Sequence, residues 1–104
     1  MLEHVLNANS VAIIGASRNK TKRGYQAIKT LLADGFEGEI YPVNPKEDYI
    51  LGLKCYKDIT DIPGKVDLAL ITTPARTIPK ILDSCGAKGV AGAVIIAGGF
   101  RELG

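Results

Sequence analysis

The chain has 104 residues, of which 46% are hydrophobic, with 12 glycines, 5 prolines and a formal net charge of +2. This length and composition fit one folded domain with many turns and exclude a disordered tail or a fibre, and the nearly balanced charge excludes a general polyanion-binding surface, so we expect no nucleic-acid partner. No apolar run reaches the roughly 18 residues that a membrane span needs and no signal-sequence pattern is present, so we expect no membrane partner and a cytoplasmic location.

The first half of the chain predicts two strands separated by a helix. Residues 1–10 place Leu2, Val5 and Leu6 at helical spacing, which predicts a short helix before a strand over residues 11–15. Apolar side chains then recur every three to four residues over 24–35, as in an amphipathic helix that stops at a glycine. Residues 39–43 predict a short second strand, in which Pro42 indicates a position where no ladder donor is needed.

The second half repeats this alternation. Residues 47–65 predict loops, a short strand near Leu53 and one helical turn. The apolar run 66–72 predicts a strand covered on both faces, and Thr77 predicts the N-cap of a helix that ends at Gly86. A fourth strand is predicted over 89–97. Alternating strands and helices predict an α/β fold, a Rossmann-like doubly wound parallel sheet in a single domain.

The turn after the first strand carries the clearest ligand-binding pattern. The small residues Gly15, Ala16 and Ser17 are followed by four cations within six residues, just before Gly24 opens the helix. These cations are Arg18, Lys20, Lys22 and Arg23. Small residues let a ligand approach the backbone, and a helix N-terminus supplies N–H donors and partial positive charge. The pattern predicts phosphate binding.

The four predicted strand exits define a candidate site. Ligands of doubly wound sheets bind beyond the carboxyl ends of the strands. All four exits here are rich in small, polar or proline residues, which ordinary turns also contain, so it is their convergence on one edge that predicts a site. The exit residues are Gly15, Ala16 and Ser17; Val43, Asn44, Pro45 and Lys46; Thr72, Thr73 and Pro74; and Ala97, Gly98 and Gly99.

The pattern disfavours a dinucleotide site. A GxGxxG fingerprint would need glycines where the chain has Ser17 and Lys20. The second strand exit has Asn44 and Lys46 in place of the acidic residue that holds the ribose of NAD. Lys46 favours a phosphorylated ribose, although a solvated loop lysine is the alternative interpretation.

Catalytic groups are sparse, so we predict no catalytic residue. His4, the single histidine, precedes the first strand, and no Ser–His–Asp arrangement can be assembled at the strand exits. Asp34, Glu37 and Glu39 gather at the opposite edge of the sheet. The pattern indicates a binding protein.

The cysteines disfavour a metal site. Cys55 and Cys85 lie in separate segments with neither CxxC spacing nor a paired histidine. We therefore predict no metal and interpret both side chains as small buried thiols.

Three segments together resemble a known family. The runs SVAIIGASRNKTKRGYQAIKTLLADGFEGEIYPVNPK, VDLALITTPARTIPKILDSCGAKGV and AVIIAGGFRELG resemble the CoA-binding domain that begins ADP-forming acyl-CoA (acetyl-CoA) synthetases. The same domain begins the succinyl-CoA synthetase alpha subunit and some protein acetyltransferases. The resemblance spans residues 10–104, and its most specific parts are the GAS turn, the VNPK exit, the proline after the third strand and the AGGF segment.

The resemblance implies a binding site for coenzyme A. In this family the first loop wraps the CoA phosphates, the second exit lies beside the adenosine and its 3′-phosphate, the third flanks the ligand, and the fourth lies near the pantetheine. The residues implied in that order are Gly15, Ala16, Ser17, Arg18 and Lys22, with Gly24 letting the helix start close by; Val43, Asn44, Pro45 and Lys46; Thr72, Thr73 and Pro74; and Ala97 and Gly98. Lys20, Thr21 and Arg23 depart from the smaller or apolar residues typical of that stretch.

Three functions stay open at this point. The first is a CoA-binding module over residues 1–104 of a longer ADP-forming acyl-CoA synthetase, not catalytic alone, with CoA or acyl-CoA and the remaining synthetase domains or subunits as partners. The second is a CoA-binding regulatory domain of a protein acetyltransferase or a stand-alone CoA sensor, and the third is an NAD(P)-binding domain. An incomplete sheet would leave an edge that favours a homo-oligomer.

Overall fold

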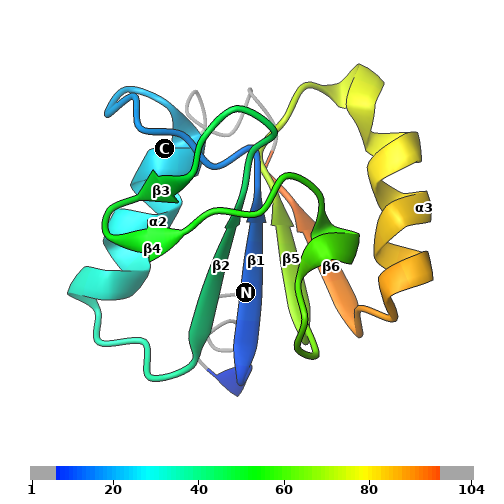
Figure 1. Cartoon of the computed structure of the whole chain (residues 1–104), viewed down its shortest axis with the longest axis horizontal. Coiled ribbons are helices and arrows are strands. Elements are labelled where there is room, and N and C mark those ends of the chain that lie inside the picture. Colours follow the sequence, from blue (N-terminus) through cyan, green and yellow to red (C-terminus); the bar gives the residue numbers. More distant parts are fainter. Residues whose placement is uncertain (1–6, 97–104) are drawn as a thin grey trace.

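A computed structural model describes residues 7–96 of the chain. Within these residues, a parallel sheet has the strand order β2–β1–β5–β6 (Figure 1). The strands are β1 (Ser10–Ile14), β2 (Glu39–Val43), β5 (Leu68–Ile71) and β6 (Gly92–Ile95). Because the chain moves from β1 outward to β2 and then returns to β5 on the other side, the strand order reverses next to β1. In such folds, this reversal is where ligands bind.

One helix covers each face of the sheet. The apolar strand β1 is buried along its whole length, and its side chains alternate between the two faces. Ile13 lies in a core cluster with Ile28 of α2 (Arg23–Ala33), whereas Ile14 lies in a second cluster with Cys85 of α3 (Ile78–Lys88). The two helices flank the sheet in Figure 1. This arrangement confirms the predicted Rossmann-like fold.

The connection between β2 and β5 contains short elements. β3 (Tyr49–Ile50) and β4 (Leu53–Lys54) form an antiparallel hairpin, and η1 (Ile59–Asp61) is one 3₁₀ turn. Ile50 packs in the cluster of α2 and Ile59 in the cluster of α3, so this connection closes the core beside β2. The predicted strand near residue 53 and the predicted helical turn are confirmed.

Three predicted elements have wrong boundaries, each for a local reason. The predicted strands 66–72 and 89–97 are shorter, Leu68–Ile71 and Gly92–Ile95: Val66 is buried in the core before β5 begins, and Gly89 belongs to the end of the preceding helix. The second helix does not end at Gly86 but continues to Lys88, since an interior glycine weakens a helix by only about 1 kcal/mol. Gly89 ends it at a left-handed φ of 85°, and its N–H donates to the carbonyls of Cys85 and Gly86.

The prediction that the Thr77 side chain caps this helix is also wrong. Thr77 directly precedes α3, yet its side chain makes no capping hydrogen bond to it. Its hydroxyl donates instead to the Pro74 carbonyl at 2.6 Å, closing the 3₁₀ turn η2 (Ala75–Thr77). Pro79 lies in the first turn of α3, where the helix needs no N–H donor from it.

Other sequence predictions can be checked briefly. Pro42 lies in β2, whose partner strand in the described sheet is β1, and its carbonyl accepts from the Tyr56 N–H outside that sheet, so the prediction that its position needs no ladder donor is confirmed. Cys55 and Cys85 are buried and unpaired, as predicted. Leu2, Val5 and Leu6 of the predicted first helix lie outside the described residues. Over residues 7–96, neither helix has the length and apolar character that a membrane crossing requires.

Candidate functional site

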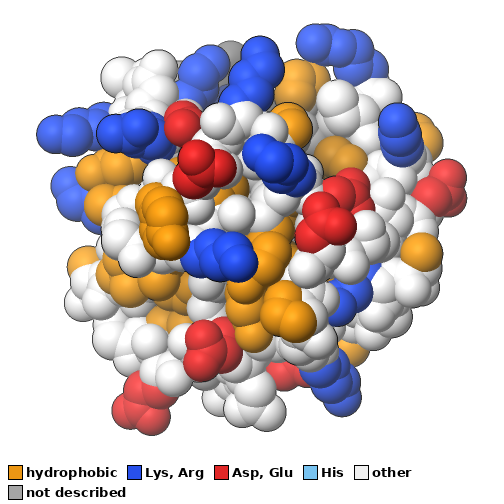
Figure 2. Space-filling view, in the orientation of Figure 1, with side chains coloured by type: hydrophobic (Ala, Val, Ile, Leu, Met, Phe, Trp, Pro, Cys, Tyr) orange, Lys and Arg blue, Asp and Glu red, His pale blue; other side chains and the backbone are white. Residues whose placement is uncertain are grey.

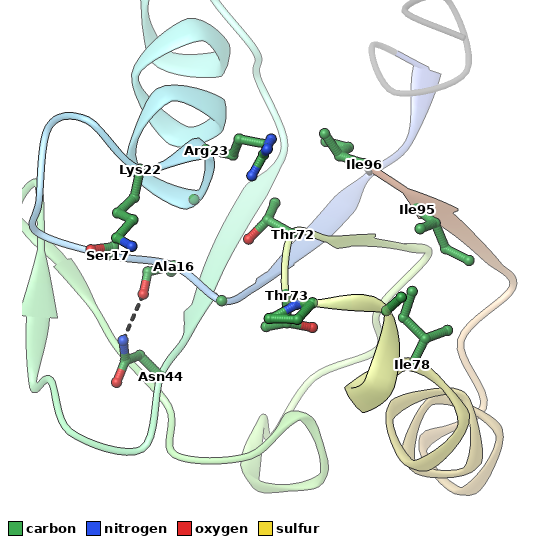
Figure 3. A pocket seen from close by; sticks show the side chains of 14 residues that line it. Ala16, Ser17, Lys22, Arg23, Asn44, Thr72, Thr73, Ile78, Ile95 and Ile96 are labelled. Carbon is green, nitrogen blue, oxygen red and sulfur yellow. Dashed lines mark hydrogen bonds between the residues drawn. The ribbon is translucent and has the colours of Figure 1, made fainter. Parts of the chain in front are cut away.

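A cavity of about 550 Å³ opens at the carboxyl ends of the strands. It lies between the N-terminus of α2 and the segment that leads through η2 into α3 (Figure 3). Its volume is within the usual range for small-molecule sites. The position is the one that the strand reversal next to β1 predicts.

Most of the predicted site residues line this cavity. They are Gly15, Ala16, Ser17, Lys22, Gly24, Asn44, Thr72, Thr73 and Pro74. Arg18, Val43, Pro45 and Lys46 are not among the lining residues, and Ala97 and Gly98 lie outside the described residues. A ligand role stays a prediction for all of the predicted site residues, including those that line the cavity.

The turn after β1 is shaped by a glycine. Gly15 has a φ of 88°, and a Cβ there would lie 2.5 Å from the hydroxyl oxygen of Thr72. The N–H groups of Gly15 and Ala16 both donate to the Val43 carbonyl, at 3.1 and 3.2 Å. The Thr72 hydroxyl donates to the Ile14 carbonyl at 2.7 Å. The first loop is thereby fixed between the exits of β2 and β5.

A second glycine brings α2 against this loop. A Cβ on Gly24 would overlap the Gly15 carbonyl oxygen and lie 2.8 Å from Cα of Ala16. The N-cap residue Lys22 makes no side-chain cap, and the first turn of α2 holds no acidic residue. Because the first N–H groups of a helix have no intrahelical acceptor, this end of α2 attracts anions.

Asn44 links the first two strand exits. Its Nδ2 donates to the Ala16 carbonyl at 2.7 Å, and its Oδ1 accepts from the Lys46 N–H at 2.7 Å. The first contact is drawn in Figure 3. The side chain therefore positions the first loop and fixes the direction of the chain toward Lys46, a role that the sequence did not reveal.

The basic loop holds its own shape. The Ser17 hydroxyl accepts from the Asn19 N–H at 3.0 Å, Oδ1 of Asn19 accepts from the Thr21 N–H at 3.0 Å, and Gln26 donates to the Lys20 carbonyl. Asn19 was missed as a positioning residue, although an asparagine two residues before a threonine is a common turn pattern.

The cavity is positively charged at its helix end and apolar at its far end. Lys22 and Arg23 line it, and no Asp or Glu is among its described lining residues. Figure 2 shows Lys and Arg side chains gathered along the upper rim, the edge at which the strands end in Figure 1. The sequence pattern includes Arg23 among four loop cations without singling it out, and it does not indicate the apolar wall of Ile78, Ile95 and Ile96, because isoleucines also form ordinary cores.

The lining is suited to binding and offers little for catalysis. It contains no histidine, cysteine or carboxylate among the described residues. Cys55 lies behind the second exit with its thiol against the Asn44 carbonyl at 3.7 Å, and burial raises the pKa of this thiol. Over residues 7–96, no cluster of three or more His, Cys, Asp or Glu side chains could hold a metal ion.

Comparison with known proteins decides the family. A profile described as "CoA binding domain" matches residues 9–102. The chain belongs to this family of CoA-binding domains. Membership supports coenzyme A as the ligand, in agreement with the resemblance seen in the sequence.

The relatives of this CoA-binding domain include much longer proteins. It is 50% identical over 103 residues to acetate–CoA ligase (ADP-forming) of Methanocaldococcus jannaschii, which is 99% of this chain and 14% of that protein. It is 49% identical over 107 residues to the alpha subunit of acetate–CoA ligase (ADP-forming) I of Pyrococcus furiosus, which is 99% of this chain and 23% of that subunit.

A solved structure agrees with the fold. The apo form of the dinucleotide-forming acetyl-coenzyme A synthetase 1 of Ca. Korarchaeum cryptofilum superposes with a TM-score of 0.88 at 43% identity, over 100% of this chain and 23% of that one. The CoA-binding domain thus spans less than a quarter of each of these three relatives.

Proposed function

We propose that this chain is the CoA-binding module of an ADP-forming acyl-CoA synthetase, an acid–thiol ligase. The observation that carries the proposal is the cavity across the strand ends, which has two cations and the N-terminus of α2 but no acidic, histidine or cysteine side chain among its described lining residues. Such a site holds a phosphate ligand without reacting with it. The ligase reaction would need further domains or subunits, with residues 1–104 as one domain of a longer cytoplasmic protein.

In this proposal CoA lies across the strand ends. The diphosphate rests against residues 15–17 and the N-terminus of α2, where the Lys22 ammonium offsets its charge. The adenosine and its 3′-phosphate lie toward residues 43–46, and the pantetheine passes residues 72–74 toward 97 and 98. The backbone and side-chain hydrogen bonds that fix the first loop keep the site ready for the ligand.

The other two candidate functions have less support. The relatives described above are CoA ligases and an acetyl-CoA synthetase, which favours a synthetase over an acetyltransferase fusion or a sensor. An NAD(P) site would need the glycine fingerprint, which the first loop lacks.

Calorimetric titration tests the proposal. The chain is titrated at fixed salt with CoA, 3′-dephospho-CoA, NAD and NADP. We expect CoA to bind most tightly, with affinity reduced about 10- to 100-fold when the 3′-phosphate is removed, as for the loss of one charge-assisted contact. Tighter binding of NAD or NADP would favour the dinucleotide function, and absence of CoA binding would contradict the proposal.

A further inference from the structure

The two cavity cations are consecutive in sequence but extend toward opposite ends of the site. In Figure 3 the Lys22 side chain runs toward Ser17, on the side where Asn44 lies. The Arg23 side chain extends from the other side of the helix N-terminus, toward Thr72 and Ile96. In the strand order β2–β1–β5–β6, Lys22 therefore serves the β2 end and Arg23 the β6 end.

The chemical character of the cavity changes along the same direction. Its β2 end presents the side chains of Ser17 and Asn44, whereas its β6 end presents Ile78, Ile95 and Ile96. Arg23 stands where the polar end meets the apolar wall. A ligand that fits this change in character has its sugar with attached phosphates at the β2 end. It has a further phosphate, followed by an aliphatic group, toward the β6 end.

The two cations also differ in how exposed they are to solvent. Lys22 is exposed, whereas Arg23 is half-buried and its Nε atom is buried. Burial limits the directions in which the Arg23 guanidinium can point, and its planar fork of N–H donors suits two oxygens of a single phosphate. Lysine is a mobile point charge and selects less by geometry.

We infer that Arg23 binds the pantetheine-side phosphate of CoA and thereby selects ligands that carry an arm beyond the diphosphate. This inference rests on the proposed function. The carbon chain that follows this phosphate in CoA starts with a methylene and then a carbon that bears two methyl groups, which Ile78, Ile95 and Ile96 can shield from water. Lys22 and the first loop hold the adenosine-side phosphate. Arg23, which the sequence pattern includes only as one of four loop cations, is thus a specificity residue.

Dissection of the ligand separates this role from a structural one. The isolated chain and its variants are titrated, by NMR chemical-shift changes, with CoA, with 4′-phosphopantetheine and with adenosine 3′,5′-bisphosphate. The second ligand keeps the pantetheine-side phosphate, whereas the third lacks both it and the arm. We expect Arg23→Gln to weaken binding of CoA and 4′-phosphopantetheine about 10- to 100-fold and to leave adenosine 3′,5′-bisphosphate within about twofold of wild type.

Three further variants sharpen the result. Arg23→Lys keeps the charge without the fork and should recover only part of the CoA affinity. Lys22→Gln should weaken adenosine 3′,5′-bisphosphate as well as CoA. Lys29→Gln removes one positive charge from α2 at an exposed position outside the cavity lining, and should leave all three affinities within about twofold of wild type.

The outcomes are distinguishable. If Arg23→Gln weakens the binding of all three ligands equally, or leaves CoA binding unaffected, the inference about Arg23 is overturned. The proposed CoA site would still be supported by weaker binding to Lys22→Gln. If the wild-type chain binds none of the three ligands, the proposed function fails and the inference falls with it. Weaker binding of CoA and 4′-phosphopantetheine, with adenosine 3′,5′-bisphosphate binding unchanged, supports the inference.

Discussion

At the scale of single residues, Gly24 controls how closely α2 approaches the first loop. A Cβ at this position would overlap the Gly15 carbonyl, a backbone atom that can move only with the whole loop. We expect Gly24→Ala to lower the free energy of unfolding by about 1–3 kcal/mol, as overpacking does, and to weaken CoA binding because α2 is displaced. Chemical denaturation and CoA titration measure the two effects.

Gly86→Ala is the matched control for this variant. Gly86 lies inside α3, and a Cβ there would meet no atom within 4 Å. Alanine should therefore raise the free energy of unfolding by about 0.5–1 kcal/mol through helix propensity, with CoA affinity unchanged. Equal behaviour of the two alanine variants would show that the close approach at Gly24 has no consequence.

Lys46 tests the predicted subsite for the 3′-phosphate. Its N–H is bonded to Asn44 whatever its side chain is, so Lys46→Ala removes the ammonium and keeps the turn. We expect CoA affinity to fall about 10- to 100-fold and 3′-dephospho-CoA affinity to stay unchanged, since only CoA carries the partner phosphate. Lys65→Ala, at an exposed position before β5 on the opposite edge, is the control. Equal losses for both ligands would contradict the subsite.

The role of a residue in the site could be predicted from the sequence only where its neighbours in the sequence determine that role. The small residues Gly15, Ala16 and Ser17 mark a turn that a ligand can approach, and the structure places them in the cavity. Among four neighbouring cations, however, the direction of each side chain depends on where α2 begins and how it packs. That packing depends on contacts between distant segments, so the sequence could not single out Arg23.

At the scale of elements, the turn η1 depends on an aspartate cap. Asp58 accepts hydrogen bonds from the N–H and the hydroxyl of Thr60, and these bonds lower the pKa of its carboxyl below 3.8. We expect Asp58→Ala to lower the free energy of unfolding by about 1 kcal/mol at pH 7. Thermal or urea unfolding of the two proteins measures the difference.

The same cap predicts a pH dependence. Because the folded-state pKa of Asp58 is lowered, its ionisation stabilises the fold above the ordinary value of 3.8, and this contribution is lost as pH falls through the folded-state value. The difference between wild type and Asp58→Ala should therefore shrink as pH is lowered below about 4. Asp58→Asn, which keeps a neutral cap, should retain most of the stability at pH 7. A difference that stays constant down to pH 2 would contradict this account.

Element types could be predicted from the sequence because periodicity reports them, whereas element ends depend on competing hydrogen bonds. The predicted helix end at Gly86 was wrong because a glycine inside a helix lowers its stability only modestly. The helix ends at Gly89, which adopts the left-handed conformation. The prediction that Thr77 caps α3 was wrong because its hydroxyl donates to the Pro74 carbonyl instead. The local sequence predicts neither the residue at which α3 ends nor the acceptor of the Thr77 hydroxyl.

At the scale of the whole molecule, the fold class followed from the order of elements, since parallel strands with helical crossovers allow few arrangements. The same topology brings the exits of strands far apart in sequence to one edge, which is why the site could be located before its side chains were known. The extent of the cavity toward Ile95 and Ile96 could not be predicted, because it depends on the register of β6 against β5, which pairs Ile95 with Ile71.

This assembly of distant segments predicts how a ligand stabilises the chain. The cavity lining comes from the first loop, α2, the exits of β2 and β5, the start of α3 and the end of β6. A ligand that contacts them all binds only the folded state, so CoA at 100 times its dissociation constant should add about 2.7 kcal/mol to the free energy of unfolding. For a domain of this size, that corresponds to an increase in Tm of roughly 10–20 °C by calorimetry.

Hydrogen exchange distinguishes this global effect from a local one. The central strands β1 and β5 exchange their amide protons mainly through unfolding of the whole domain, so CoA should slow their exchange together with that of residues 15–24. NAD at the same concentration, which lacks the pantetheine arm, is the control and should slow neither set to the same degree. Slower exchange confined to residues 15–24, with no change in the strands or in Tm, would mean that CoA contacts the first loop alone and that the β6 end of the cavity contributes nothing to binding.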